Sequence, residues 1–151
     1  MALLDTTLSM LHVLFAGLWT GATVFYAWRI HPLLVDGEIG VTPAMAITTG
    51  LRWLTRIGAV VFVATGGHMA GTGYGDGRLL NDPMGHAVLG MLVLWLIVTG
   101  LLEVSIGKIQ DALREGKIQT AGRETETLVR VAATFSVVLL LIGGYLAQPL
   151  V

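Results

Sequence analysis

The sequence predicts an all-α membrane protein built as a bundle of four transmembrane helices. Hydrophobic residues occupy 54% of the 151 positions and charged residues only 13%, and the mean hydropathy is +0.77, well above the range of soluble domains. Four apolar runs are each close to the ~20 residues that cross ~30 Å of hydrocarbon. We therefore expect one transmembrane domain over residues 1–151, in a multi-pass protein of the cell membrane.

The four helices are expected at about residues 8–30, 43–74, 83–115 and 121–147. The first run lacks a basic leading segment and a small-residue cleavage site, so we expect a retained helix rather than a signal peptide. The pair His31-Pro32 should end it, because the residue before a proline disfavours the α conformation.

Two Pro-containing pairs predict the next helix starts. Thr42-Pro43 and Asp82-Pro83 are each typical of an N-cap followed by proline in the first turn of a helix. The glycine-rich segment 71–77 should end the second helix, and Gly116 the third. Short loops join antiparallel neighbours, which favours an up-down-up-down order.

The basic residues predict the orientation in the membrane. Eight of the nine lysines and arginines flank the loops after the first and third runs, and Arg78 alone lies in the loop after the second. The positive-inside rule places those two basic loops in the cytoplasm and both termini outside. The basic residues are interleaved with glutamates, so they give no nucleic-acid signature.

One histidine stands among small residues in the second apolar run. An imidazole within a bilayer costs several kcal/mol unless it has a partner, so His68 marks a candidate functional site. Its helical neighbours on the same face are Ala64, Thr65, Gly71 and Thr72. Such a flat face would suit a planar macrocycle or a closely packed second helix.

A second histidine is expected at the same depth. His12 lies about five residues, and His68 about six, inside the outer end of its helix, which places both roughly 8 to 9 Å below the outer surface. Two imidazoles on adjacent helices can ligate a haem iron from opposite sides. The sequence therefore predicts His12 and His68 as metal ligands. The chain has no cysteine, which excludes thiolate sites.

Further residues are candidates for the same site. On the first helix, Trp19 shares the stripe of His12, and Tyr145 lies at the outer end of the fourth helix. His86, at the start of the third helix, could meet a haem propionate. His31 is expected on the cytoplasmic side of the membrane, so it cannot be part of this site. Glu103, near the inner end of the third helix, is expected to pair with Arg56 or Arg130, or to be an interfacial group, rather than to carry protons.

Two other interpretations of these residues are a purely structural role and a copper site. Each histidine could instead bond a neighbouring helix, the glycines could serve helix packing alone, and Trp19 could be a core residue. Thioether and imidazole ligands suit copper, and Met10, Met69 and Met84 each lie within two residues of a histidine. Met10 and His12 are about 200° apart around one helix, so they cannot chelate one ion together.

The first two helices resemble those of the CopD/HemJ group of small membrane proteins. The resemblance lies in His12, Trp19, Gly21, Phe25-Tyr26 and Arg29-to-His31, and in Thr65-Gly66-Gly67. For HemJ-type protoporphyrinogen oxidases it implies a haem b ligand at His12. Those enzymes also carry a lysine in the third helix, whereas the third helix here has no lysine before Lys108. For CopD-type domains it implies copper uptake.

We therefore expect a membrane b-type haem protein for electron transfer, with a bis-histidine haem near the outer face. Its partners would be the lipid bilayer and a redox partner or quinone, and a homo-oligomer is compatible with the small-residue faces. The alternatives are a CopD-like copper-handling protein and a HemJ-like protoporphyrinogen oxidase.

Overall fold

The computed structural model describes residues 2–147, and every regular element in that range is a helix. The elements are α1 (Ala2–Phe25), the π-helix η1 (Tyr26–Ile30), α2 (His31–Asp36), α3 (Val41–Gly73), α4 (Arg78–Asn81), α5 (Pro83–Arg114) and α6 (Ile118–Leu146). Four continuous helical stretches are long and apolar enough to cross a membrane: 3–36, 41–73, 83–114 and 118–146. The prediction of an all-α protein with four such helices is confirmed.

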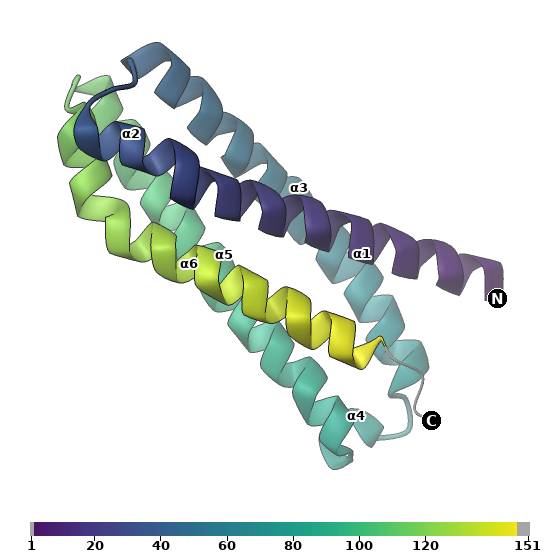
Figure 1. Cartoon of the computed structure of the whole chain (residues 1–151). Helices are drawn as coiled ribbons and strands as arrows, with labels where there is room; N and C mark the ends of the chain where they lie inside the picture. The colour runs from purple at the N-terminus through teal and green to yellow at the C-terminus, as the bar shows by residue number, and fades with distance from the viewer. Residues whose placement is uncertain (1, 148–151) are drawn as a thin grey trace.

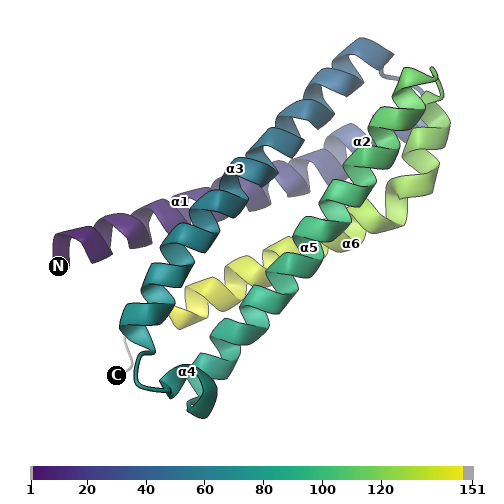
Figure 2. The ribbon, with the colours of Figure 1, turned by 180° about the vertical axis from the view of Figure 1, so that it is seen from behind.

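The four stretches form a ring in which each packs on two others. α1 packs on α3 and α6, and α5 packs on α3 and α6 as well, as Figures 1 and 2 show from opposite sides. We call the end with α2 and the loops 37–40 and 115–117 the basic end, and the end with His12, His68 and α4 the histidine end. The predicted placement of the termini outside the membrane stays a prediction.

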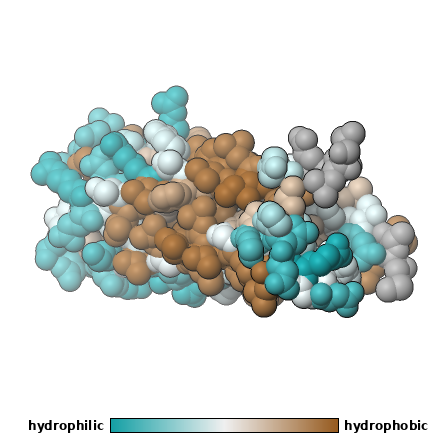
Figure 3. Space-filling view, turned by 90° about the horizontal axis from the view of Figure 1, so that it is seen from below, coloured by the Kyte–Doolittle hydropathy of each residue, from teal (hydrophilic) through white to brown (hydrophobic). Residues whose placement is uncertain are grey.

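A hydrophobic belt surrounds the bundle. Figure 3 shows hydrophobic residues gathered across the middle of one face, with hydrophilic residues toward both ends. Large apolar side chains such as Val60, Leu92 and Leu141 are exposed. In water this exposure would be unfavourable, whereas in hydrocarbon it is the expected surface of a spanning helix.

The first helix does not end at His31-Pro32, which corrects the predicted boundary. The chain stays helical to Asp36 by way of η1, where the backbone N–H of His31 donates to the carbonyl oxygen of Tyr26, five residues earlier. A π-turn widens the helix by one residue, and it lies where Pro32 has no N–H to donate. Gly37, in the left-handed conformation at φ 73°, ends α2 instead.

The next two boundaries differ in how well the local signal predicts them. α3 begins at Val41 after Gly40, and no side chain caps it, so the predicted N-cap role of Thr42 is wrong. Pro43 still lies in the first turn, where no N–H is needed. Asp82 does cap α5, because its Oδ1 accepts from the backbone N–H of Met84 at 2.9 Å, and Pro83 follows as predicted.

The tightly packed part of the bundle lies at the basic end and in the middle. One cluster of buried residues includes Tyr26, Leu34 and Ile109, and a second includes Trp19 and Leu102. Toward the histidine end, none of residues 3–18 of α1 is buried. In Figures 1 and 2 this part of α1 diverges from α5 and α6. The core of this chain therefore leaves the histidine end open.

Candidate functional site

His12 lies in the contact between α1 and α3. Its Nδ1 is 2.7 Å from Thr65 Oγ1, and its ring meets the Phe62 ring edge-on at a centroid distance of 5.2 Å. Gly66 allows this approach, because a Cβ there would be only 3.3 Å from His12 Cε1. The close contact between α1 and α3 at this level thus depends on a glycine.

The hydrogen bonds around Thr65 assign the tautomer of His12. The Thr65 hydroxyl has one proton, and it donates that proton to the carbonyl oxygen of Val61 at 2.6 Å. In the contact with His12 the hydroxyl oxygen must therefore accept, and His12 Nδ1–H donates. Neutral His12 then carries its lone pair on Nε2, for which no described residue provides a hydrogen bond. This is the arrangement in which a second group orients a metal-binding imidazole.

His68 is held in a comparable way by a carboxylate. Its Nε2 is 2.7 Å from Asp5 Oδ1, and an ionised carboxylate only accepts, so Nε2–H donates. The Nδ1 of His68 has no hydrogen-bond partner among the described residues. Carboxylate-to-imidazole bonds of this kind fix the ring orientation of many metal-binding histidines.

The two imidazoles occupy adjoining turns of the contact between α1 and α3. His12 lies against Thr65 and Gly66, and His68 follows Thr65 by three residues on the same helix, a rise of about 4.5 Å. Each ring thus has one nitrogen held by an oxygen acceptor and one nitrogen free. Among residues 2–147 no group of three or more His, Asp or Glu side chains gathers as a metal site.

Trp19 joins His12 indirectly. Its ring lies 6.0 Å from that of Phe62, and Phe62 lies 6.2 Å from Trp95 on α5. Trp19 is buried and its indole N–H donates to Thr55 Oγ1 at 3.1 Å. Phe62 of α3 therefore contacts His12 and Trp19 of α1 as well as Trp95 of α5, so the aromatic cluster links three helices around His12.

Among the described residues, no hydrogen bond or ring contact joins the two other predicted site residues to this pair. His86 is exposed, and its Nε2–H donates to the carbonyl oxygen of Leu80 at 2.8 Å, across the corner between α4 and α5. The side chain of Tyr145 is exposed. His31, excluded from the site by the sequence, is buried at the basic end with Nε2 at 3.0 Å from Thr125 Oγ1.

Sequence reasoning missed three side chains that hold the pair: Asp5, Phe62 and Thr65. Asp5 stands seven residues before His12, which is two helical turns on the same face, and Thr65 stands three before His68. These spacings were visible in the sequence. The register of α1 against α3, which makes them partners, was not.

The small face beside His68 is only partly used by this chain. A Cβ at Gly67 or Gly71 would meet nothing within 4 Å, whereas Gly66 supports the contact with His12. Close packing of the described helices therefore accounts for Gly66 and leaves Gly67 and Gly71 on a bare surface.

The chain matches no protein-family model, no curated protein and no solved structure.

Proposed function

We propose that this chain is a membrane electron-transfer protein that binds a b-type haem near the histidine end, with His12 and His68 as axial ligands. The observation that supports the proposal is the pair of imidazoles, each with one nitrogen held by an oxygen acceptor and the other free. A porphyrin supplies four of the six ligands of its iron, so two imidazoles are the number that the protein must provide. The resemblance to the CopD/HemJ group agrees with His12 as a ligand.

Each residue has a defined part in this proposal. His12 Nε2 and His68 Nδ1 would hold the group, and before it binds Thr65 and Asp5 hold the two rings with these nitrogens free. The bare surface at Gly67 and Gly71 would accept a flat ring without a clash. The bound haem would supply reversible one-electron chemistry, and the open histidine end would give a redox partner access to it.

A porphyrin fits between His12 and His68 only if the two helices that carry them move apart. His12 now lies directly on α3, so a porphyrin ligated by both rings requires α1 and α3 to be further apart at this level. No residue of α1 from 3 to 18 is buried, so moving that segment away would cost mainly the His12–Thr65 and Asp5–His68 hydrogen bonds and the contact of His12 with the Phe62 ring. The proposal therefore includes an outward displacement of the first half of α1 on haem binding.

The absorption spectrum tests the proposal directly. Protein expressed with haem supplied and purified in detergent should show a Soret band and the bands of a six-coordinate low-spin haem. His12→Ala and His68→Ala should each abolish six-coordination. His86→Ala is the matched control and should leave the spectrum unchanged, because His86 bonds the backbone of Leu80. A purified protein without a Soret band would refute the proposal.

Copper handling is the second candidate, and the closed contact between α1 and α3 favours it. A single copper ion needs only the width of one atom between two imidazole nitrogens, and imidazole is a good copper ligand. The same preparation separates the candidates by its metal content. One bound copper ion lost in both His12→Ala and His68→Ala, without a Soret band, would select copper.

A further inference from the structure

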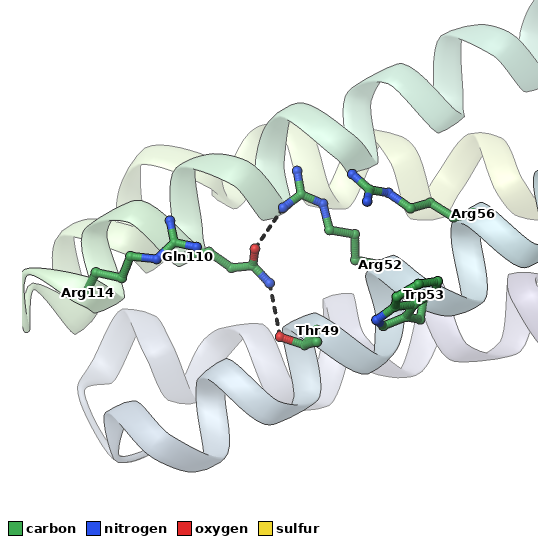
Figure 4. Close-up of a pocket in the computed structure, with 6 residues that line it drawn as sticks. All are labelled: Thr49, Arg52, Trp53, Arg56, Gln110 and Arg114. Carbon is green, nitrogen blue, oxygen red and sulfur yellow. Dashed lines mark hydrogen bonds between the residues drawn. The ribbon is translucent and has the colours of Figure 1, made fainter.

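A polar cavity opens between α3 and α5 at the basic end. It has a volume of about 270 Å³ and is lined by Thr49, Arg52, Trp53, Arg56, Gln110 and Arg114. Figure 4 shows Arg52 reaching from α3 to Gln110 on α5, with Arg56 and Arg114 to either side of this bond. Three of the six lining side chains are cationic, and none is anionic.

Two acceptors hold the central arginine in place. Arg52 Nε–H donates to Glu103 Oε2 at 3.0 Å and its Nη1 donates to Gln110 Oε1 at 2.8 Å. Gln110 is itself oriented, because its Nε2 donates to Thr49 Oγ1 at 3.2 Å. Holding Arg52 from both sides removes much of the rotational entropy that a free arginine would lose on binding an anion.

The nearby carboxylates accept only some of the N–H groups of the three arginines. Glu103 binds Arg56 through Nε and Nη2, both at 3.0 Å, and Asp111 binds Arg114 through Nη1 at 2.6 Å. Among the described residues no acceptor takes the N–H groups on Nη2 of Arg52, Nη1 of Arg56 or Nη2 of Arg114. Three guanidiniums facing two carboxylates leave a net positive charge and free donors of the kind that bind phosphate.

The cavity lies where a lipid headgroup would be. Arg56 immediately precedes the apolar run that begins at Ile57, so the cavity borders the hydrocarbon layer. Trp53 is 61% exposed, as expected for an aromatic anchor at a membrane interface. Ile57 and Val60 continue the face of Trp53 into the belt at helical spacing, and both are exposed.

We propose that this cavity binds the phosphate of an anionic membrane lipid, with an acyl chain lying along Trp53, Ile57 and Val60. Basic pockets between transmembrane helices on the positively charged side of a membrane protein are suited to such headgroups. The apolar continuation favours a lipid over free phosphate, which would use the guanidiniums alone. The site is at the opposite end of the bundle from the histidine pair, so it does not depend on the proposed haem function.

A titration of the whole protein in non-ionic detergent tests the proposal. Short-chain phosphatidylglycerol, phosphatidylcholine and inorganic phosphate are added separately, and binding is measured by calorimetry. Phosphatidylglycerol should bind saturably at one site and more tightly than phosphatidylcholine. Inorganic phosphate should not bind at concentrations that saturate the lipid site. Equal affinity for the two lipids, or phosphate binding as tight as phosphatidylglycerol, would overturn the proposal.

Matched charge variants locate the site. Arg56→Gln and Arg114→Gln should each weaken phosphatidylglycerol binding about fivefold, the usual contribution of one basic side chain at a membrane surface. Arg29→Gln removes the same charge from the same end, at an exposed position outside the cavity, and should have no effect. Equal weakening by all three would indicate a general surface charge effect and refute the cavity. Circular dichroism and gel filtration verify that each variant is folded, and Arg114, exposed and paired only with Asp111, is the variant least able to disturb the fold.

Discussion

The imidazole of His12 donates its Nδ1 proton to the hydroxyl oxygen of Thr65, 2.7 Å away on the neighbouring helix. Because the Thr65 hydroxyl gives its own proton to Val61, this bond determines which nitrogen of His12 is free. A threonine that looks like an ordinary small residue in the sequence thus controls the chemistry of the histidine opposite it.

Thr65→Val tests this relationship. Valine has nearly the shape of threonine but cannot accept the proton of His12 Nδ1–H, so the tautomer would no longer be fixed. Nitrogen NMR of isotopically labelled histidine should show one Nδ1-protonated ring in the native protein and a mixture in the variant. Affinity of the site for copper, which the closed contact between α1 and α3 would hold, should fall about 10- to 100-fold, as for other lost partners of metal-binding imidazoles.

Thr72→Val is the control for that experiment. The Thr72 hydroxyl bonds the carbonyl oxygens of His68 and Met69 on its own helix, so its loss should leave the tautomer and the affinity unchanged. An unchanged His12 signal in Thr65→Val would show that this hydroxyl does not determine the tautomer.

The orientation in the membrane is a separate prediction, based on the eight basic residues at one end. The chain has no cysteine, so single-cysteine variants report one position each. Asp76→Cys, in the loop at the histidine end, should react in intact cells with a reagent that cannot cross membranes. Glu115→Cys, in a loop at the basic end, should react only after lysis. The reverse pattern would place the basic end outside.

Local signals predicted the elements better than the contacts between them. Four apolar runs predicted four spanning helices because hydrocarbon length and hydropathy act on each segment separately. Asp82-Pro83 predicted a helix start correctly because the cap involves only neighbouring residues. His31-Pro32 misled the prediction because the helix continues past the proline by way of a π-turn, and α2 then packs against α6.

The candidate site was predictable to a similar extent. His12 and His68 could be selected because an imidazole in a bilayer requires a partner. Their partners, Thr65 and Asp5, depend on the register of two helices, which no local pattern specifies. Glu103 illustrates the same limit: of the two predicted partners, Arg56 or Arg130, the structure pairs it with Arg56, and its bond to Arg52 was not foreseen.

The stability of the α3–α5 contact should depend on Glu103. Glu103→Gln removes the charge that binds Arg52 and Arg56, and the Glu103 and Arg52 side chains are each only 28% exposed. We expect a loss of about 1–3 kcal/mol, as for hydrogen bonds to charged groups that are partly buried. Thermal unfolding in detergent should show a lower midpoint. Asp111→Asn, which breaks the exposed i,i+3 pair with Arg114, should cost no more than about 0.5 kcal/mol, and equal effects of the two changes would contradict this assignment.

The contact between α2 and α6 should depend on a single glycine. A Cβ at Gly122 would lie 2.5 Å from the backbone nitrogen of Val35 and 2.8 Å from the carbonyl carbon of Leu34, so Gly122→Ala must push the two helices apart. Backbone atoms cannot rotate away as a flexible side chain can, and we expect the free energy of unfolding to fall by about 1–3 kcal/mol.

Gly21→Ala is the control, because a Cβ there meets nothing within 4 Å and alanine favours the helix by up to about 1 kcal/mol. Unfolding in detergent should therefore rank Gly21→Ala at or above the native protein and Gly122→Ala well below it. Equal midpoints for the two variants would show that α6 does not approach α2 as closely as the structure places it.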